Sequence, residues 1–140
     1  MSFSLHPQLA ADTFVVGDLP LCQVLLMNEM RYPWFILVPR RADLTEIYQL
    51  EAKDRQQLWQ ESDWLSRQLL ALFKPDKLNI AALGNVVAQL HLHHIARFTT
   101  DAAWPAPVWG KFQPEAYPAA LAQERISALQ QRLSLYAAKT

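Results

Sequence analysis

The sequence predicts an α+β domain built on an antiparallel sheet of about five strands, with a long amphipathic helix across the sheet and a second helix at the C-terminus. Short apolar runs bounded by Pro, Gly and polar residues alternate with two longer segments whose apolar residues recur every three or four positions. The 140 residues are 51% apolar and 19% charged. This balance is typical of a folded domain with one core and excludes a disordered chain.

The predicted strands are short and mostly apolar. They cover residues 13–16, 21–27, 34–38, 77–83 and 86–98. A short polar loop joins the second and third of these runs, which indicates an antiparallel hairpin. A short helix over residues 6–11 precedes the first strand.

The long helix is predicted over residues 52–73. Leu58, Leu65 and Leu69 follow one another at helical spacing, so they share one face. Lys74 precedes Pro75, and a residue before proline avoids the α region, which ends the helix. A second amphipathic helix begins near Pro118.

The bulk properties limit the classes of partner. The chain has 13 basic and 13 acidic residues, so it carries no charge excess for binding a nucleic acid polymer. Cys22 is the only cysteine, which excludes an intrachain disulfide. No segment approaches the roughly 20 apolar residues of a membrane span, and the N-terminus lacks the basic and apolar regions of a secretory signal. We therefore expect a cytoplasmic protein without a membrane partner.

Three of the four histidines fall within residues 91–94. Because side chains alternate along a strand, Gln89, His91 and His93 are predicted to share one face. Leu90, Leu92 and His94 are predicted on the other, with His94 structural or exposed. Two aligned imidazoles beside an amide form a polar platform on a rigid element.

Two chemistries fit this pattern. Both imidazoles could bind zinc, with a third ligand from elsewhere, although with His94 on the other face only His6 and Cys22 remain among histidines and cysteines. Alternatively, one imidazole attacks phosphorus while its neighbours position the phosphate. The residues themselves leave this choice open.

The segment Gly84-Asn-Val-Val-Ala-Gln-Leu-His-Leu-His-His-Ile95 resembles the signature of the histidine triad family, Gly-Gln-x-Val-x-His-x-His-x-His. The segment Trp34-Phe-Ile-Leu-Val-Pro-Arg40 resembles the family strand that ends in Pro-Lys or Pro-Arg. The similarity covers residues 16–98, and the order of hairpin, helix and strands also matches. It implies a single domain over residues 1–140 of the histidine triad hydrolase type, similar to diadenosine polyphosphate hydrolases, with a core over 16–98 and a C-terminal loop and helix over 99–140.

The resemblance assigns roles to the histidine segment. His91 takes the central position, which forms a nucleotidyl-histidine intermediate in the family, and His93 takes the third position, near the phosphates. Gln89 stands where the first histidine is usual. An amide can donate a hydrogen bond to a phosphate but carries no proton to a leaving group. Asn85 replaces a usual glutamine, and Val86 replaces a Ser or Thr that often contacts the phosphate.

Other positions complete the implied site. Asn79 and Asn28 match positions near the nucleotide, and Trp34 stands where a histidine is common. The resemblance implies a hydrolase or transferase for nucleotide phosphoanhydrides or phosphoramidates, with no obligatory metal or cofactor. It also implies a homodimer, for which Trp59 and Trp64 offer apolar surface.

Two alternatives remain beside this function. A nucleotide-binding regulatory module with little turnover is favoured by Gln89 and Val86. A zinc-dependent hydrolase would use His91 and His93 as ligands.

Overall fold

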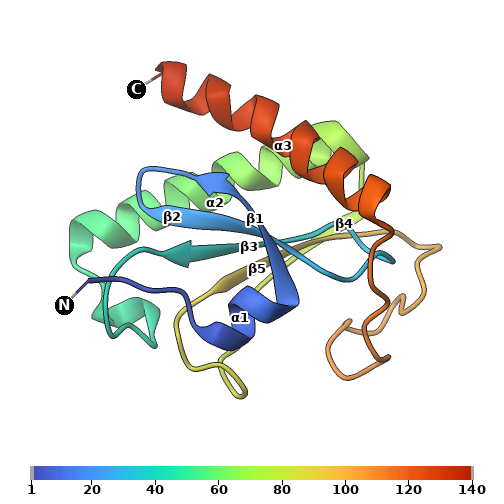
Figure 1. The fold of residues 1–140 in the computed structure, drawn as a ribbon, viewed down its shortest axis with the longest axis horizontal. Coiled ribbons are helices and arrows are strands. Elements are labelled where there is room, and N and C mark those ends of the chain that lie inside the picture. The colour runs from blue at the N-terminus through green and yellow to red at the C-terminus, as the bar shows by residue number, and fades with distance from the viewer. Residues whose placement is uncertain (1, 140) are drawn as a thin grey trace.

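The computed structural model describes residues 2–139 and contains one five-stranded antiparallel sheet (Figure 1). The strands lie in the order β1-β2-β3-β5-β4. They are β1 (Thr13–Asp18), β2 (Cys22–Met27), β3 (Trp34–Pro39), β4 (Lys77–Ala82) and β5 (Leu92–Arg97). The helices are α1 (Pro7–Asp12), α2 (Ala52–Phe73) and α3 (Ala119–Lys139), and a 3-10 turn, η1 (Ile47–Gln49), precedes α2. The predicted fold class is confirmed.

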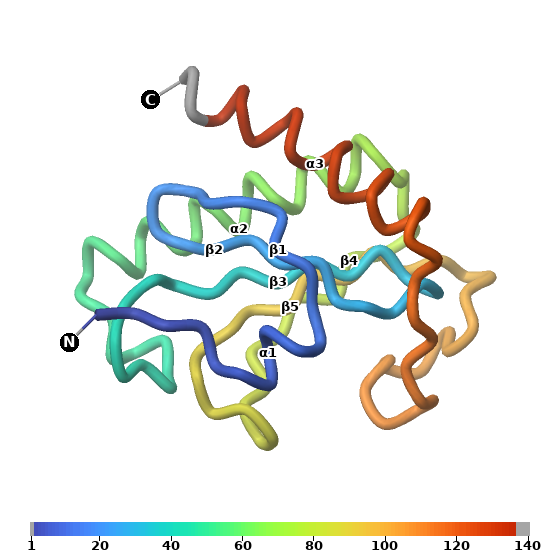
Figure 2. The backbone as a smooth tube through the Cα atoms, viewed as in Figure 1, coloured from blue at the N-terminus to red at the C-terminus, as the bar shows by residue number. Residues whose placement is uncertain are grey.

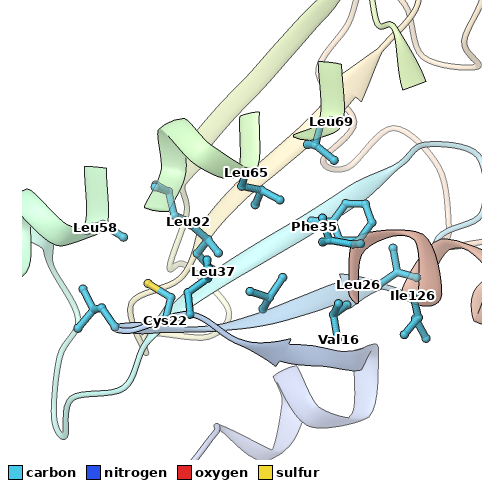
Figure 3. Packing of buried hydrophobic residues seen from close by; sticks show 14 of the residues in the cluster. Val16, Cys22, Leu26, Phe35, Leu37, Leu58, Leu65, Leu69, Leu92 and Ile126 are labelled. Atoms are coloured by element: carbon cyan, nitrogen blue, oxygen red, sulfur yellow. The ribbon is translucent and has the colours of Figure 1, made fainter. Parts of the chain in front are cut away.

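Helices α2 and α3 cover one face of the sheet. Leu58, Leu65 and Leu69 of α2 pack with Phe35 of β3 and Leu92 of β5 in a buried core (Figure 3). The helical spacing that predicted residues 52–73 therefore arises from this contact, and Lys74 ends α2 in the left-handed conformation at φ 52°. Ile126 and Leu129 of α3 extend the same core.

The opposite face of the sheet has a smaller cover. Ile36 and Ile95 pack there with Leu9 of α1 and with Val108 from the connection between β5 and α3. Figure 2 shows that connection as a loop at the right of the view, outside the sheet. This second face therefore lies under a short helix and loops rather than under a continuous helical layer.

The buried carboxylate of Glu61 holds helix α2 against the sheet. Glu61 of α2 accepts hydrogen bonds from the backbone N–H groups of Leu21 (2.7 Å) and Cys22 (2.8 Å), where β2 begins. The amide of Gln57 donates a third at 2.7 Å. Buried charges are tolerated where hydrogen bonds satisfy them, so this contact fixes the position of α2 along β2.

The last strand begins later than the sequence predicts. β5 starts at Leu92, and residues 86–91 form an irregular segment instead of the first half of a strand over 86–98. The backbone N–H of Leu90 donates to the carbonyl oxygen of Leu44 at 2.9 Å, and Gln89 bonds the N-terminal segment. The carbonyl of Leu44 lies outside the sheet and satisfies a backbone N–H that a longer strand would have paired.

Within residues 2–139, no helix is both long enough and apolar enough to traverse a bilayer.

Candidate functional site

β5 directs two adjacent histidines to opposite faces of the sheet. His94 lies on the α2 side, where its Nε2 is 2.7 Å from Oγ of Ser62 and its Nδ1 is 3.1 Å from the carbonyl oxygen of Leu92. It is fully buried, so His94 is structural. His93 lies on the other face, opposite Ile36 of β3 and Ala81 of β4.

His91 precedes β5, and its ring contacts that of His93, with 4.8 Å between the ring centroids. Nδ1 of His91 lies 2.7 Å from the carbonyl oxygen of Gln89. A carbonyl only accepts, so Nδ1 carries the proton and Nε2 keeps a free lone pair. Burial lowers the pKa of His91; the hydrogen bond to the Gln89 carbonyl opposes this shift, and nearby His6 adds to it. At neutral pH, His91 is therefore an uncharged imidazole whose orientation is fixed by this hydrogen bond.

His93 is enclosed by aromatic rings. The indole nitrogen of Trp34 donates to its Nδ1 at 3.0 Å. Trp34 and Trp109 both meet the imidazole edge-on, at centroid distances of 5.6 and 5.2 Å. Burial, with smaller contributions from His91 and His94, lowers the pKa of His93 to about 3. His93 is therefore neutral at physiological pH.

Gln89 is joined to the N-terminal segment. Its Oε1 accepts from the backbone N–H of His6 at 2.8 Å, and its Nε2 donates to the carbonyl oxygen of Ser4 at 2.9 Å. The oxygen and the nitrogen of the side-chain amide are thus both hydrogen-bonded to backbone atoms, which lie 83 and 85 residues away in the sequence. Of the three side chains predicted to share a face, His91 and His93 have rings in contact, whereas Gln89 anchors the chain beside them.

Two cavities lie next to the paired histidines. His91 lines one of about 220 Å³ together with Gly84, Asn85 and Gln89. The other, of about 410 Å³, is lined by Asn28, Trp34 and Trp109 among others. His91 thus lines the smaller cavity directly, whereas His93 contacts the two tryptophans that line the larger cavity.

The predicted asparagines have different environments. Asn85 is exposed at the smaller cavity. Oδ1 of Asn28 accepts from the backbone N–H of Tyr117 at 2.9 Å, and the side chain lines the larger cavity. Oδ1 of Asn79 accepts from the guanidinium of Arg97 at 2.8 Å. The structure brings Asn28 and Asn85 to cavities beside the histidines and uses the oxygen of Asn79 in an internal contact.

Several residues around the site were missed by the sequence analysis. Glu29 and Arg31 line the larger cavity and bond each other. Arg97 is buried and pairs with Asp101, with 2.7 Å between Nε and Oδ2. The four-residue spacing of this last pair gave no signal, because it indicates a contact on a helix, whereas Arg97 ends a strand and Asp101 lies in the loop that follows. The Glu29–Arg31 pair also gave none, because nothing in a loop of mixed charge indicates a cavity.

The two imidazoles also have the residue type of zinc ligands. Across residues 2–139, no three His, Cys, Asp or Glu side chains are grouped so that they could hold a metal ion. The Nδ1 atoms of His91 and His93 already have partners, which leaves one nitrogen on each ring.

The sheet, its helical layer and the paired imidazoles define a protein of the histidine triad class. Residues 8–100 match the family model described as the HIT domain, and the chain belongs to that family.

Solved structures agree with this assignment. A histidine triad protein from Bradyrhizobium japonicum is 52% identical, with a TM-score of 0.93 over 95% of this chain and 99% of its own. One from Marinobacter aquaeolei is 48% identical, with a TM-score of 0.94 over 97% and 99%. One from Sinorhizobium meliloti is 40% identical, with a TM-score of 0.90 over 92% and 96%. No match is found among curated proteins.

Proposed function

We propose that this protein is a nucleotide hydrolase or nucleotidyl transferase in which His91 attacks phosphorus. The observation that carries the proposal is the hydrogen bond from Nδ1 of His91 to the Gln89 carbonyl. It presents an unprotonated Nε2 from a ring that lines a cavity. A neutral imidazole with a fixed tautomer is an activated nucleophile.

The reaction proceeds in two steps. Nε2 of His91 forms a bond to phosphorus as the bond to the leaving group breaks, which gives a nucleotidyl-histidine. A phosphate leaving group departs as an anion, whereas the amine of a phosphoramidate takes a proton from water as it departs. Positive charge then resides on the imidazole, and the carbonyl of Gln89 stabilises it through the Nδ1–H. Attack by water, or by an acceptor in a transferase, breaks the P–N bond and restores His91.

Different residues bind the phosphate and the nucleoside of the substrate. The side-chain amide of Asn85 supplies a hydrogen-bond donor beside His91 for the phosphate. Asn28 and Trp109 line the larger cavity, which suits a nucleoside. The substrate class is a phosphoanhydride, such as a dinucleoside polyphosphate, or a phosphoramidate of a nucleotide. The chemistry requires no metal or cofactor.

The decisive experiment traps the intermediate. The protein is mixed rapidly with a panel of dinucleoside polyphosphates and nucleoside phosphoramidates, quenched, and examined by intact mass spectrometry for an added nucleotidyl group. His91→Asn should abolish both adduct and turnover while retaining nucleotide binding, because the apolar anchors Leu90 and Leu92 are unchanged. His93→Ala should slow the reaction less, because His93 positions the phosphate and does not attack it.

A second candidate function is a nucleotide-binding module with little turnover. It is favoured by Val86, which is 92% exposed and offers a phosphate no polar side chain, and by the engaged amide of Gln89. Nucleotide binding with no adduct, and equal slow hydrolysis by wild type and His91→Asn, would replace the enzyme with this module.

A further inference from the structure

Trp34 makes a buried polar contact to the catalytic pair proposed above. Trp34 is the first residue of β3, and its indole nitrogen lies 3.0 Å from Nδ1 of His93. Trp34 is 7% exposed and His93 is 4% exposed, so water does not compete for this hydrogen bond. An indole N–H only donates, and therefore Nδ1 of His93 must accept.

The contact determines where the proton of His93 resides. A neutral imidazole carries one N–H, and with Nδ1 accepting, that proton lies on Nε2. The ring of His93 meets Trp34, Trp109 and His91 edge-on, at centroid distances of 5.6, 5.2 and 4.8 Å. Its strand neighbours Ile36 and Ala81 are apolar and offer no alternative partner. The tautomer is thus set by Trp34.

We propose that Trp34 is a positioning residue for the nucleotidyl transfer proposed above, because it holds His93 in the tautomer whose Nε2–H donates to a phosphoryl oxygen beside His91. This inference rests on the proposed function for its catalytic consequence. An indole N–H does not ionise at physiological pH, so Trp34 orients His93 without acting as its acid or base. His93 then serves as a hydrogen-bond donor, and the leaving group departs without a proton from His93.

A supporting fact is the charge state of His93. Because burial lowers its pKa to about 3, the ring does not compete for a proton with the leaving group near neutral pH. Protonation would place a second hydrogen on Nδ1, directed at the indole N–H, and would break the hydrogen bond from Trp34.

The first test is a measurement on the ligand-free wild-type protein. In protein labelled with 15N, a coupling across the N–H···N hydrogen bond should connect the indole nitrogen of Trp34 with Nδ1 of His93. The chemical shift of Nε2 should be that of a protonated ring nitrogen. Absence of the coupling, or a proton on Nδ1, overturns the inference without any variant.

The second test uses matched variants. Trp34→Phe keeps an aromatic ring but removes the N–H, and should release His93 into a mixture of tautomers. Trp109→Phe is the control, since Trp109 contacts the same imidazole but gives it no hydrogen bond, and the tautomer should stay fixed. Trp34→Phe should also lower the rate of adduct formation by on the order of tenfold, the loss of one hydrogen bond, with little change in KM.

The outcomes separate the two proposals. Adduct formation at an unchanged rate in Trp34→Phe overturns the role of Trp34 and leaves the proposed function intact. The coupling in wild type with no adduct on any substrate overturns the proposed function, and with it a catalytic role for Trp34, while the hydrogen bond stands. Circular dichroism of each variant verifies that it is folded.

Discussion

Acid should destabilise this protein through histidines that are buried without charge. His94 has no exposed surface, and burial lowers its pKa to about 4 from an ordinary value of 6.5. His93 has a pKa lowered to about 3 from the same value. In the unfolded chain both rings bind protons as the pH falls through 6.5, whereas in the folded protein they do not. The unfolded state therefore binds more protons, and stability falls as the pH falls.

The magnitude follows from the two pKa values. Between the unfolded and folded pKa, each such group lowers the free energy of unfolding by about 1.4 kcal/mol per pH unit. From about pH 7.5 to about pH 5, His94 contributes a loss of about 2 kcal/mol, and His93 contributes a similar loss. A total of about 4 kcal/mol is a large part of the stability of an ordinary domain, which is about 5–15 kcal/mol.

Urea denaturation, followed by tryptophan fluorescence at one protein concentration, measures this loss at both pH values. The test variant is His94→Asn, which removes the titrating ring and should reduce the acid loss by about 2 kcal/mol. The control is Ser62→Ala, which removes the hydroxyl bonded to Nε2 of His94 and lowers stability at both pH values by about 1–3 kcal/mol. Because Ser62→Ala keeps the ring, it should retain the pH dependence. The full acid loss in His94→Asn would refute the argument.

Three further predictions concern stability, the N-terminal segment and assembly. Arg97→Ala should lower the free energy of unfolding by about 3 kcal/mol, measured by urea denaturation, because it leaves the buried carboxylate of Asp101 unpaired; a loss typical of an exposed pair would contradict this. Gln89→Ala should speed amide hydrogen exchange at His6, whose N–H loses its acceptor, and unchanged exchange would show that other contacts hold the segment. We expect an isologous dimer that uses the half-exposed Trp59 of α2, so Trp59→Glu should shift sedimentation toward monomer, and a wild-type species of only 16.1 kDa would exclude the dimer.

The sequence predicted the secondary structure where local chemistry is decisive. Helix α2 was predicted over residues 52–73 and spans them, because its apolar spacing is set by burial against the sheet and Pro75 limits its end. The hairpin of β2 and β3 was predicted from two apolar runs and a short loop, and the two strands do pair. The prediction that His91 and His93 lie together is confirmed by the contact between their rings.

The partners of the polar side chains could not be predicted from the sequence. Gln89 was expected to face a phosphate with the histidines, yet its amide bonds backbone atoms of Ser4 and His6. β5 begins at Leu92 because the residue Leu90 before it bonds Leu44, outside the sheet. The alternation of residues along a strand does not predict such a contact with a distant segment.

The sequence by itself therefore determined the elements, the family signature and the pair of imidazoles, because periodicity and residue type are local properties of the chain. Only the tertiary structure decided which nitrogen of each imidazole carries its proton. That choice depends on one hydrogen bond per ring: the carbonyl of Gln89 requires a proton on Nδ1 of His91, and the indole of Trp34, 59 residues away, excludes one from Nδ1 of His93. The partner of His93 reaches it only because β3 pairs with β5.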